Sequence, residues 1–427
     1  MKDLYNRRAI ADDVYFTSVT DTKFKVNRVS VIFISQLSEN ASGNAVIPRI
    51  LSKCCESFNT MTKLNRRLAE LYSADITWSV RADTDYQYCD LSATCLDSRF
   101  ALNGEDILKE TVSILIDCIF KPYFENGFFP AGSLEIEKQN QIDDNNAEIN
   151  DKTHYAYLKA YEEAFRGEPA AIRWGGTNEQ VEALDAQKAL EAYRRLIGEC
   201  RTEIICVGEN SFDGMDKLFA DAFGSIARKP SELPEVMLSP DKNEVSRITE
   251  TLDVEQCKLV MFFKTSDRYR KKYPLMVMSY LYGGTESSKL FSIVREKMSL
   301  CYYCFSRIGF AKGFMTTECG VDSQNLGPAE KECLNQLSEI TKGNFTDDEL
   351  NKVKLYIGNL LRSVGDTIGG VGSRCLADIM FPEYADTTEN VIAAVNAVTH
   401  DDVTEAAKSL RLDTVFILKT DKEADAQ

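Results

Sequence analysis

Residues 64–76 read LNRRLAELYSADI, and residues 290–302 read LFSIVREKMSLCY. Both stretches begin with a helix-like spacing of apolar residues and run into a strand-like end. The equivalent pairs are Leu64 with Leu290, Leu68 with Val294, Glu70 with Glu296 and Ser73 with Ser299. A passage that recurs at this distance indicates that one structural unit occurs twice in the chain.

The segments around the two passages repeat in the same order. Strand-like runs rich in β-forming residues precede them at 26–34 and 257–263, and alternating runs follow at 77–95 and 303–321. Helices are predicted at 46–58, 106–120, 134–165 and 186–196, and again at 273–281, 328–341, 347–379 and 401–410; closing strands are predicted at 203–208 and 414–418. This order predicts an α+β protein of two homologous repeats that superpose, each a mostly antiparallel sheet with helices packed on one face.

A polar stretch with two prolines, KPSELPE at 229–235, separates the two repeats. Such a stretch forms neither a stable helix nor a central strand, so it marks a boundary. We therefore expect an N-terminal domain at 1–228, a linker at 229–244 and a C-terminal domain at 245–427.

The composition excludes several classes of partner. A formal net charge of -16 opposes binding to nucleic acid or to anionic membranes through bulk electrostatics. No segment reaches the roughly 18 uncharged apolar residues of a membrane span, and charged residues interrupt the first 25 residues where a signal peptide would be apolar. Thirteen scattered cysteines fit reduced thiols better than a disulfide framework. These features predict a cytoplasmic protein.

Histidine limits the chemistry further, because the chain contains only His154 and His400. A zinc site built on neighbouring imidazoles, or a Ser/His/Asp triad, is therefore disfavoured. His154 falls in a helical pattern and is predicted to be a packing or surface residue. His400 follows Thr399 at a predicted helix start and is expected to belong to a local capping context.

The order of these segments resembles that of the pitrilysin/insulinase-type metallopeptidases over nearly the whole chain. The family's Gly-x-Pro and Gly-Thr element is similar to Gly167-Glu168-Pro169 followed by 174–177, which read WGGT. Its Ser-Arg-Leu-Phe stretch, which continues to a tyrosine, is similar to residues 288–302. The resemblance implies duplicated α/β units of this size.

Active members of this family carry His-x-x-Glu-His on their first long helix, where the two histidines bind zinc and the glutamate activates water. The equivalent helix here places Ala45 and Arg49 at the histidines and Pro48 at the glutamate. Alanine has no donor atom, proline cannot act as a base, and arginine brings a permanent positive charge. We therefore expect no catalytic residue, no metal ligand and no cofactor in this chain.

The third zinc ligand of the family is a glutamate in a Glu-x6-Glu pattern, for which Glu137 and Asp144 are the nearest match. Two interpretations stay open for Asp144. It faces the former zinc pocket, or it belongs to a solvated acidic helix together with Asp143 and Glu148. A single carboxylate would hold a metal ion weakly after the loss of both histidines.

Arg295 and Tyr302 keep an Arg-x6-Tyr spacing that, in active assemblies of the family, lies where the second half binds the substrate peptide. The resemblance thus implies a substrate-binding role for both residues. The alternative is structural: Arg295 pairs with a carboxylate on its own helix, and Tyr302 is an ordinary strand aromatic.

Two further motifs are expected to be structural. Cys301 and Cys304 are spaced as in redox or metal sites, but residues three apart on a strand point to opposite faces, so their sulfurs are expected to diverge. The glycine-containing stretch 283–288 lacks the Gly-Lys-Ser/Thr ending of a phosphate-binding loop.

Within this family, the chain resembles the non-catalytic, YmfF-like members. It implies a partner or substrate-binding subunit that forms a heterodimer with an active zinc peptidase, or a homodimer in isolation, and binds a peptide or protein substrate. In that lineage the pair is associated with modification of elongation factor P. The alternatives are a metallopeptidase with a rearranged site that uses Asp144, and a stand-alone scaffold that binds extended peptides on its sheet edges. The chain alone is expected to bind no stoichiometric zinc and to cleave no peptide.

Overall fold

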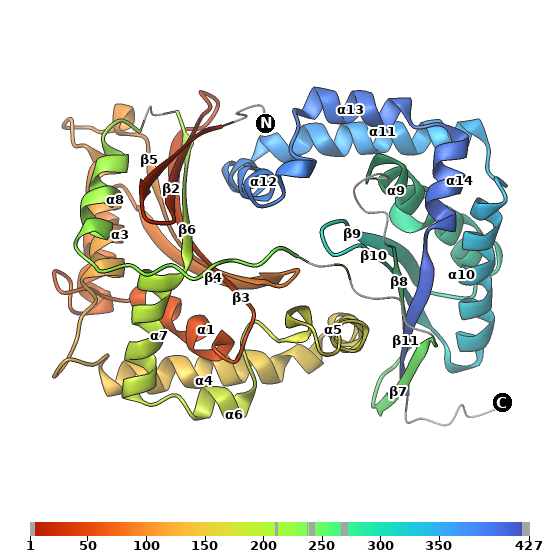
Figure 1. The fold of residues 1–427 in the computed structure, drawn as a ribbon, viewed down its shortest axis with the longest axis horizontal. Helices are drawn as coiled ribbons and strands as arrows, with labels where there is room; N and C mark the ends of the chain where they lie inside the picture. Colours follow the sequence, from red (N-terminus) through yellow and green to blue (C-terminus); the bar gives the residue numbers. More distant parts are fainter. Residues whose placement is uncertain (1–4, 210–211, 237, 239–243, 266–271, 421–427) are drawn as a thin grey trace. The chain divides into compact units, whose positions relative to one another are not determined.

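A computed structural model of the protein describes residues 5–209, 212–236, 238, 244–265 and 272–420. The chain divides into two compact units, and each contains one sheet (Figure 1). Unit 1 combines Met1–Asn146, Ile172–Glu235 and Val364–Ala385, and unit 2 combines Ala147–Ala171, Val236–Ser363 and Asp386–Gln427. Each unit thus contains segments from both halves of the chain. The boundaries at 228 and 245 stay a prediction, and part of the linker lies outside the described residues.

The sheet of unit 1 has the strand order β1-β2-β6-β3-β5-β4. Its strands are β1 Asn6–Ala11, β2 Val14–Thr20, β3 Val26–Gln36, β4 Asp75–Asp83, β5 Tyr86–Leu96 and β6 Arg201–Gly208. Only the β2–β6 pair is parallel, and the other four neighbouring pairs are antiparallel. The sheet is therefore mostly antiparallel, as predicted.

The sheet of unit 2 repeats this topology with the order β7-β11-β8-β10-β9. Its strands are β7 Ser246–Leu252, β8 Cys257–Lys264, β9 Tyr303–Gly309, β10 Phe314–Val321 and β11 Arg411–Thr420. The β7–β11 pair is parallel and the other three pairs are antiparallel. The first sheet has the same pattern in its neighbouring strands β2-β6-β3-β5-β4. The aligned Ser73 and Ser299 both adopt a left-handed backbone, with φ of 60° and 50°. The prediction of an α+β fold with two repeats is confirmed.

Helices cover the apolar face of each sheet. Along β3, Val29, Val31 and Phe33 belong to the core with α1 (Ala41–Leu51) and α3 (Ile107–Phe120). The alternation arises because successive side chains of a strand point to opposite faces. The other helices of unit 1 that flank or extend this layer are α2 Met61–Glu70, α4 Ala131–Ala147, α6 Asn178–Glu182, α7 Ala186–Glu199 and α8 Met215–Gly224. Unit 2 has α9 Lys272–Ser279, α10 Leu326–Thr341, α11 Asp347–Ser363, α13 Thr388–Ala397 and α14 His400–Lys408.

Two helices that the sequence predicts as continuous are each broken in the structure. The segment 134–165 divides after α4, and α5 (Lys152–Ala164) begins where Asp151 accepts hydrogen bonds from the backbone N–H groups of Thr153 and His154. The segment 347–379 divides after α11, and α12 (Ile368–Met380) begins where Thr367 accepts from the N–H of Gly370. The prediction of continuous helices was wrong because these side chains cap a new helix in mid-segment.

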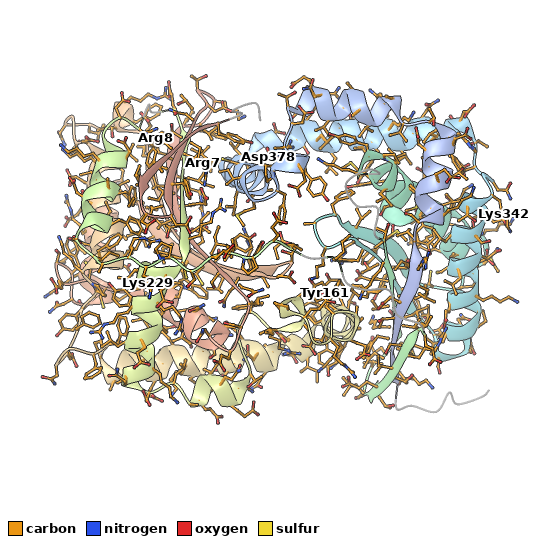
Figure 2. All side chains as sticks on the ribbon, in the orientation of Figure 1. Arg7, Arg8, Tyr161, Lys229, Lys342 and Asp378 are labelled. Carbon is orange, nitrogen blue, oxygen red and sulfur yellow. The ribbon has the colours of Figure 1, made fainter. Side chains whose placement is uncertain are left out.

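The two breaks are important because the helix after each break belongs to a different unit from the helix before it. Helix α5, from the first half of the chain, packs on β8 and β11 of unit 2. Its buried Ala156, Ala160 and Ala164 are spaced one turn apart, which lets the helix approach the sheet closely. Tyr161 of α5 (Figure 2) lies edge-on to Phe262, with ring centroids 6.0 Å apart.

Helix α12, from the second half of the chain, packs on β6 and β3 of unit 1. Gly372 of this helix lies beside Val207 of β6, where a Cβ would make an ordinary contact of 3.7 Å with Cγ2 of Val207. At its other end, the hydroxyl of Tyr5 donates to Asp378 at 2.7 Å. The second face of each sheet is therefore covered by one helix from the opposite half of the chain. None of the described helices combines the length and apolarity needed to cross a membrane.

Candidate functional site

The helix equivalent to the family's zinc-binding helix is α1, and the predicted positions on it are buried. Ala45 is fully buried and Pro48 lies inside the helix. Proline has no backbone N–H, so it leaves the carbonyl of Asn44 without its usual intrahelical partner. The thiol of Cys89 on β5 donates to this carbonyl at 3.4 Å. Pro48 is thus accommodated in the helix and offers no group for chemistry.

Arg49 occupies the second histidine position, and only 4% of its surface is exposed. Its guanidinium lies 2.6 Å from Oδ2 of Asp144 and 3.1 Å from Oε1 of Gln141. The guanidinium carbon also lies 4.2 Å from the ring centroid of Trp78 on β4. The structure therefore brings Arg49 and Asp144 together, two of the positions that the sequence assigned to the lost zinc site.

The acidic helix α4 adds a series of hydrogen-bonded polar side chains to this cluster. Gln141 is fully buried, and its amide donates to Asn145 at 2.8 Å, while Asn145 donates to Asn178 at 3.0 Å. A Cβ on Gly175 would lie 2.4 Å from Nε2 of Gln141, so a larger residue there would displace this amide from its hydrogen bond to Asn145. The glycines of the 174–177 element thus pack against the former site.

Glu137, the other carboxylate of the predicted pattern, is 6% exposed. It lies 4.0 Å from Nζ of Lys53 and accepts a hydrogen bond from Asn140 at 2.9 Å. Both interpretations of Asp144 stay open, because its side chain is 57% exposed, as in a solvated acidic helix, while its carboxylate pairs with Arg49. This pairing with a fixed cation opposes binding of a dication by the same carboxylate.

Strand β4 lies beside this cluster at the edge of the sheet, and it pairs with β5 on one side only within the part of the chain that the structure describes. An edge strand presents free backbone N–H and C=O groups, to which an extended peptide can add as a further strand. Trp78, which contacts Arg49, belongs to this strand. The cluster around Arg49 and the edge strand β4 are therefore adjacent.

The predicted substrate-binding residues lie in unit 2. Arg295 is in the π-helical segment η5 (Leu290–Lys297), where its guanidinium carbon lies 4.5 Å from the ring centroid of Phe291 and Nη1 lies 3.7 Å from Oε1 of Glu296. It lines an open cavity of about 730 Å³ together with Tyr303 and Tyr356. A guanidinium at the wall of a cavity is available to hydrogen-bond a ligand carbonyl or carboxylate.

Tyr302 is 53% exposed and precedes β9. Its hydroxyl donates to Oδ1 of Asp322 at 3.0 Å, and this hydrogen bond, with the negative charge of Asp322, raises the pKa of Tyr302. Tyr303, rather than Tyr302, lines the cavity that contains Arg295. The substrate-binding role of both residues stays a prediction.

The two histidines have the local contacts that the sequence suggests. His154 stacks on Tyr157 within α5, with centroids 6.3 Å apart. His400 begins α14, where Thr399 and Asp402 form a capping box, and it stacks on Phe345 at 3.9 Å.

A cluster that the sequence interpretation missed lies under β9 and β10. The sulfurs of Cys304, Cys319 and Cys333 all lie within 4.8 Å of one another. Cys301 is not part of this group, but the interaction of its thiol with Cys304 lowers the pKa of Cys301, which does not fit two sulfurs on opposite faces of a strand. Cys301 lies before β9 begins, and strand alternation does not apply to it. The Cys301-x-x-Cys304 spacing was the signal that could have found this cluster.

Several known proteins are similar to this chain in sequence or in fold. Residues 183–356 match the model described as "Peptidase M16 inactive domain". The chain is 25% identical over 410 residues to "Probable inactive metalloprotease YmfF" of Bacillus subtilis, with 94% of each protein covered. A crystal structure of a conserved protein from Enterococcus faecalis covers 99% of this chain and 100% of its own, with 26% identity and a TM-score of 0.91. A peptidase M16 inactive domain from Pseudomonas fluorescens has a TM-score of 0.79 at 16% identity, with 98% of both chains covered, and shares the fold.

Proposed function

We propose that this chain, an M16-like peptidase homologue without the family's zinc motif, acts as a non-catalytic, substrate-binding partner of an active zinc peptidase. The observation that supports this most directly is the Arg49–Asp144 pair at 2.6 Å. A built-in cation takes the place of the metal, while the adjacent edge strand β4 remains able to bind extended peptide. The first site thus keeps a binding surface and has no catalytic group.

The second contribution in this proposal comes from unit 2. In an assembly of two such chains, the unit that carries Arg295 would close over the zinc site of the partner and hydrogen-bond the bound peptide. Losing the metal in this chain would then leave catalysis in the partner intact. The cavity of about 730 Å³ beside Arg295 gives room for a peptide side chain or backbone turn.

A metal test follows from the Arg49–Asp144 pair. Replacing both carboxylates (Glu137→Gln with Asp144→Asn) should leave the metal content of the dialysed chain unchanged, because neither binds zinc. The purified chain should also cleave no member of a peptide library. Zinc that the double variant removes, or cleavage that a chelator inhibits, would instead support the rearranged metallopeptidase.

The trans role predicts the effect of removing Arg295 and Tyr302. In a reconstituted pair with its active partner, Arg295→Ala with Tyr302→Phe should lower kcat/KM for the peptide by at least about 30-fold, since the two lost hydrogen bonds, made where water is excluded, each contribute about 1–3 kcal/mol. Assembly of the pair, measured by gel filtration with light scattering, should persist. Lys297→Ala, an exposed cation on the same segment, serves as the control.

An unchanged kcat/KM in an intact heterodimer would reduce both residues to structural ones. Failure of any complex to form would remove the trans role and favour the stand-alone scaffold, which rests on the free edge of β4. Purification from the native host separates these two, because only the partner role requires an active zinc peptidase to copurify. The link to elongation factor P modification is part of the proposal and rests on the family resemblance alone.

A further inference from the structure

Three cysteines converge in unit 2 from three different elements, and a fourth, Cys301, lies outside this group. Cys304 on β9 and Cys319 on β10 are direct cross-strand partners, and their sulfurs lie 2.7 Å apart. Cys333 on α10 lies across the sheet surface, with its sulfur 3.7 Å from each of the other two. All three are buried, with exposures of 5%, 1% and 0%.

Two of the three distances match a metal-binding geometry, and the third, 2.7 Å between Cys304 and Cys319, lies between the values for a disulfide and for two metal-bound sulfurs. A disulfide requires an S–S distance of about 2.05 Å. Four sulfurs at about 2.3 Å from a tetrahedral zinc ion lie about 3.8 Å from each other. Two of the three edges of the triangle already have this length.

Cys301 is a candidate for the fourth sulfur, and its side chain would have to turn toward the other three to bind the same ion. It is half-buried, shares a side-chain hydrogen bond with Cys304, and lies in the turn between η5 and β9. Cys301 and Cys304 have the Cys-x-x-Cys spacing of many zinc sites, and the backbone bends at Tyr302 between them. The positive charge of Arg295 also acts on Cys301, and it would offset part of the negative charge of a thiolate cluster.

The surroundings provide both a rigid frame and an access path. The buried hydroxyl of Tyr282 donates to the backbone carbonyl of Cys333 at 3.0 Å, and Thr317 donates to the same hydroxyl at 3.3 Å. These bonds fix α10 against β10 next to the sulfurs, as outer hydrogen bonds do in metal sites. Cys304 also lines the open cavity that contains Arg295, which gives an ion a route from solvent.

We propose that Cys301, Cys304, Cys319 and Cys333 bind one thiophilic metal ion, Zn²⁺, in a structural site that fixes the start of β9 and the adjacent Arg295 segment. Each thiol releases its proton on binding. This goes beyond the partner function and does not depend on it. It replaces the expectation that the whole chain is free of zinc, and it leaves the conclusion about Arg49 and Asp144 unchanged.

The test uses the reduced, metal-stripped full chain and Co²⁺ as the probe. One equivalent of Co²⁺ should produce the near-ultraviolet charge-transfer absorption of cobalt–thiolate bonds and the strong visible bands of a tetrahedral ion. Zn²⁺ should displace both signals. The same Zn²⁺ should protect four thiols from alkylation, as counted by mass spectrometry of the labelled peptides.

Variants locate the site. Cys304→Ser and Cys333→Ser should each weaken binding at least about 100-fold, and Cys301→Ser, at a half-buried position, should keep three sulfurs and shift the visible bands. Cys118→Ser is the matched control, because Cys118 is also buried and its thiol interacts with that of Cys55. Among the described residues, these two cysteines belong to no group of three metal-binding side chains. Circular dichroism of the metal-free variants identifies those that fold, and Cys301→Ser keeps the test decisive if the buried ones do not.

Three outcomes would overturn the proposal. The wild type shows no cobalt–thiolate absorption; Co²⁺ binding survives Cys301→Ser and Cys304→Ser unaltered; or Cys304 and Cys319 form a disulfide under a mild oxidant as readily with Zn²⁺ as without it. The last result would make the cluster a redox pair.

Discussion

Residues 245–427 expressed alone are expected to remain unfolded, although they contain every strand of the second sheet. The reason is that α5, which precedes residue 245 in the chain, covers one face of this sheet. Without it, the sheet face formed by Val260, Phe262, Phe314, Phe416 and Leu418, all buried in the whole chain, is open to water. Burial of each such side chain contributes about 1.5–3 kcal/mol, so the loss is about 8–15 kcal/mol. This loss is as large as the total stability of a typical domain, about 5–15 kcal/mol, so the fragment should not fold.

A matched fragment isolates the effect of α5. Residues 147–427 contain all of unit 2 and should show a cooperative unfolding transition by circular dichroism, whereas 245–427 should not. Within the full chain, Phe165→Ala should destabilise unit 2 by about 3–5 kcal/mol. Phe165 is fully buried, and its ring centroid lies 4.6 Å from that of Tyr161 and 5.6 Å from that of Phe314. Cooperative folding of 245–427 alone would show that each repeat is stable without the exchanged helix.

Arg49→Ala is expected to destabilise the protein by about 2–4 kcal/mol, and Asp144→Asn by about 0–1 kcal/mol. The two differ because their surroundings differ. The side chain of Arg49 is 5% exposed and packs on Trp78, so its removal leaves a cavity and an unpaired Gln141 acceptor. The side chain of Asp144 is 57% exposed, so water compensates for most of the lost ion pair.

Chemical denaturation of both variants measures this difference. Arg67→Ala is the control, because Arg67 pairs with Glu70 and Glu110 on the protein surface and should cost about 0–1 kcal/mol. An Asp144→Asn cost as large as that of Arg49→Ala would mean that the charge pair itself, rather than packing of the arginine stem, stabilises the former zinc site. Arg49→Met, which keeps most of the stem, should fall between the two.

The fold could be predicted from sequence because its signals are local. Alternating apolar residues define β3 and its counterpart β8, and the paired passages at 64–76 and 290–302 recur in the same order. The absence of histidine from the first 150 residues settles by composition alone that no imidazole zinc site exists there. Helix continuity was harder to predict, because a single capping side chain such as Asp151 decides whether a polar helix continues or begins again.

The sequence by itself determined the duplicated α+β unit and the replacement of the zinc motif, since both depend on residue type and on spacing within one segment. Only the tertiary structure decided the exchange of α5 and α12, the pairing of Arg49 with Asp144 and the convergence of the cysteines. Arg49 and Asp144 are 95 residues apart, and Cys304 and Cys333 are 29 apart. Such partners are chosen by the packing of whole elements and carry no local periodic signal. The strand rule failed at Cys301 for the same reason, because the turn before β9, rather than the spacing, sets where its sulfur points.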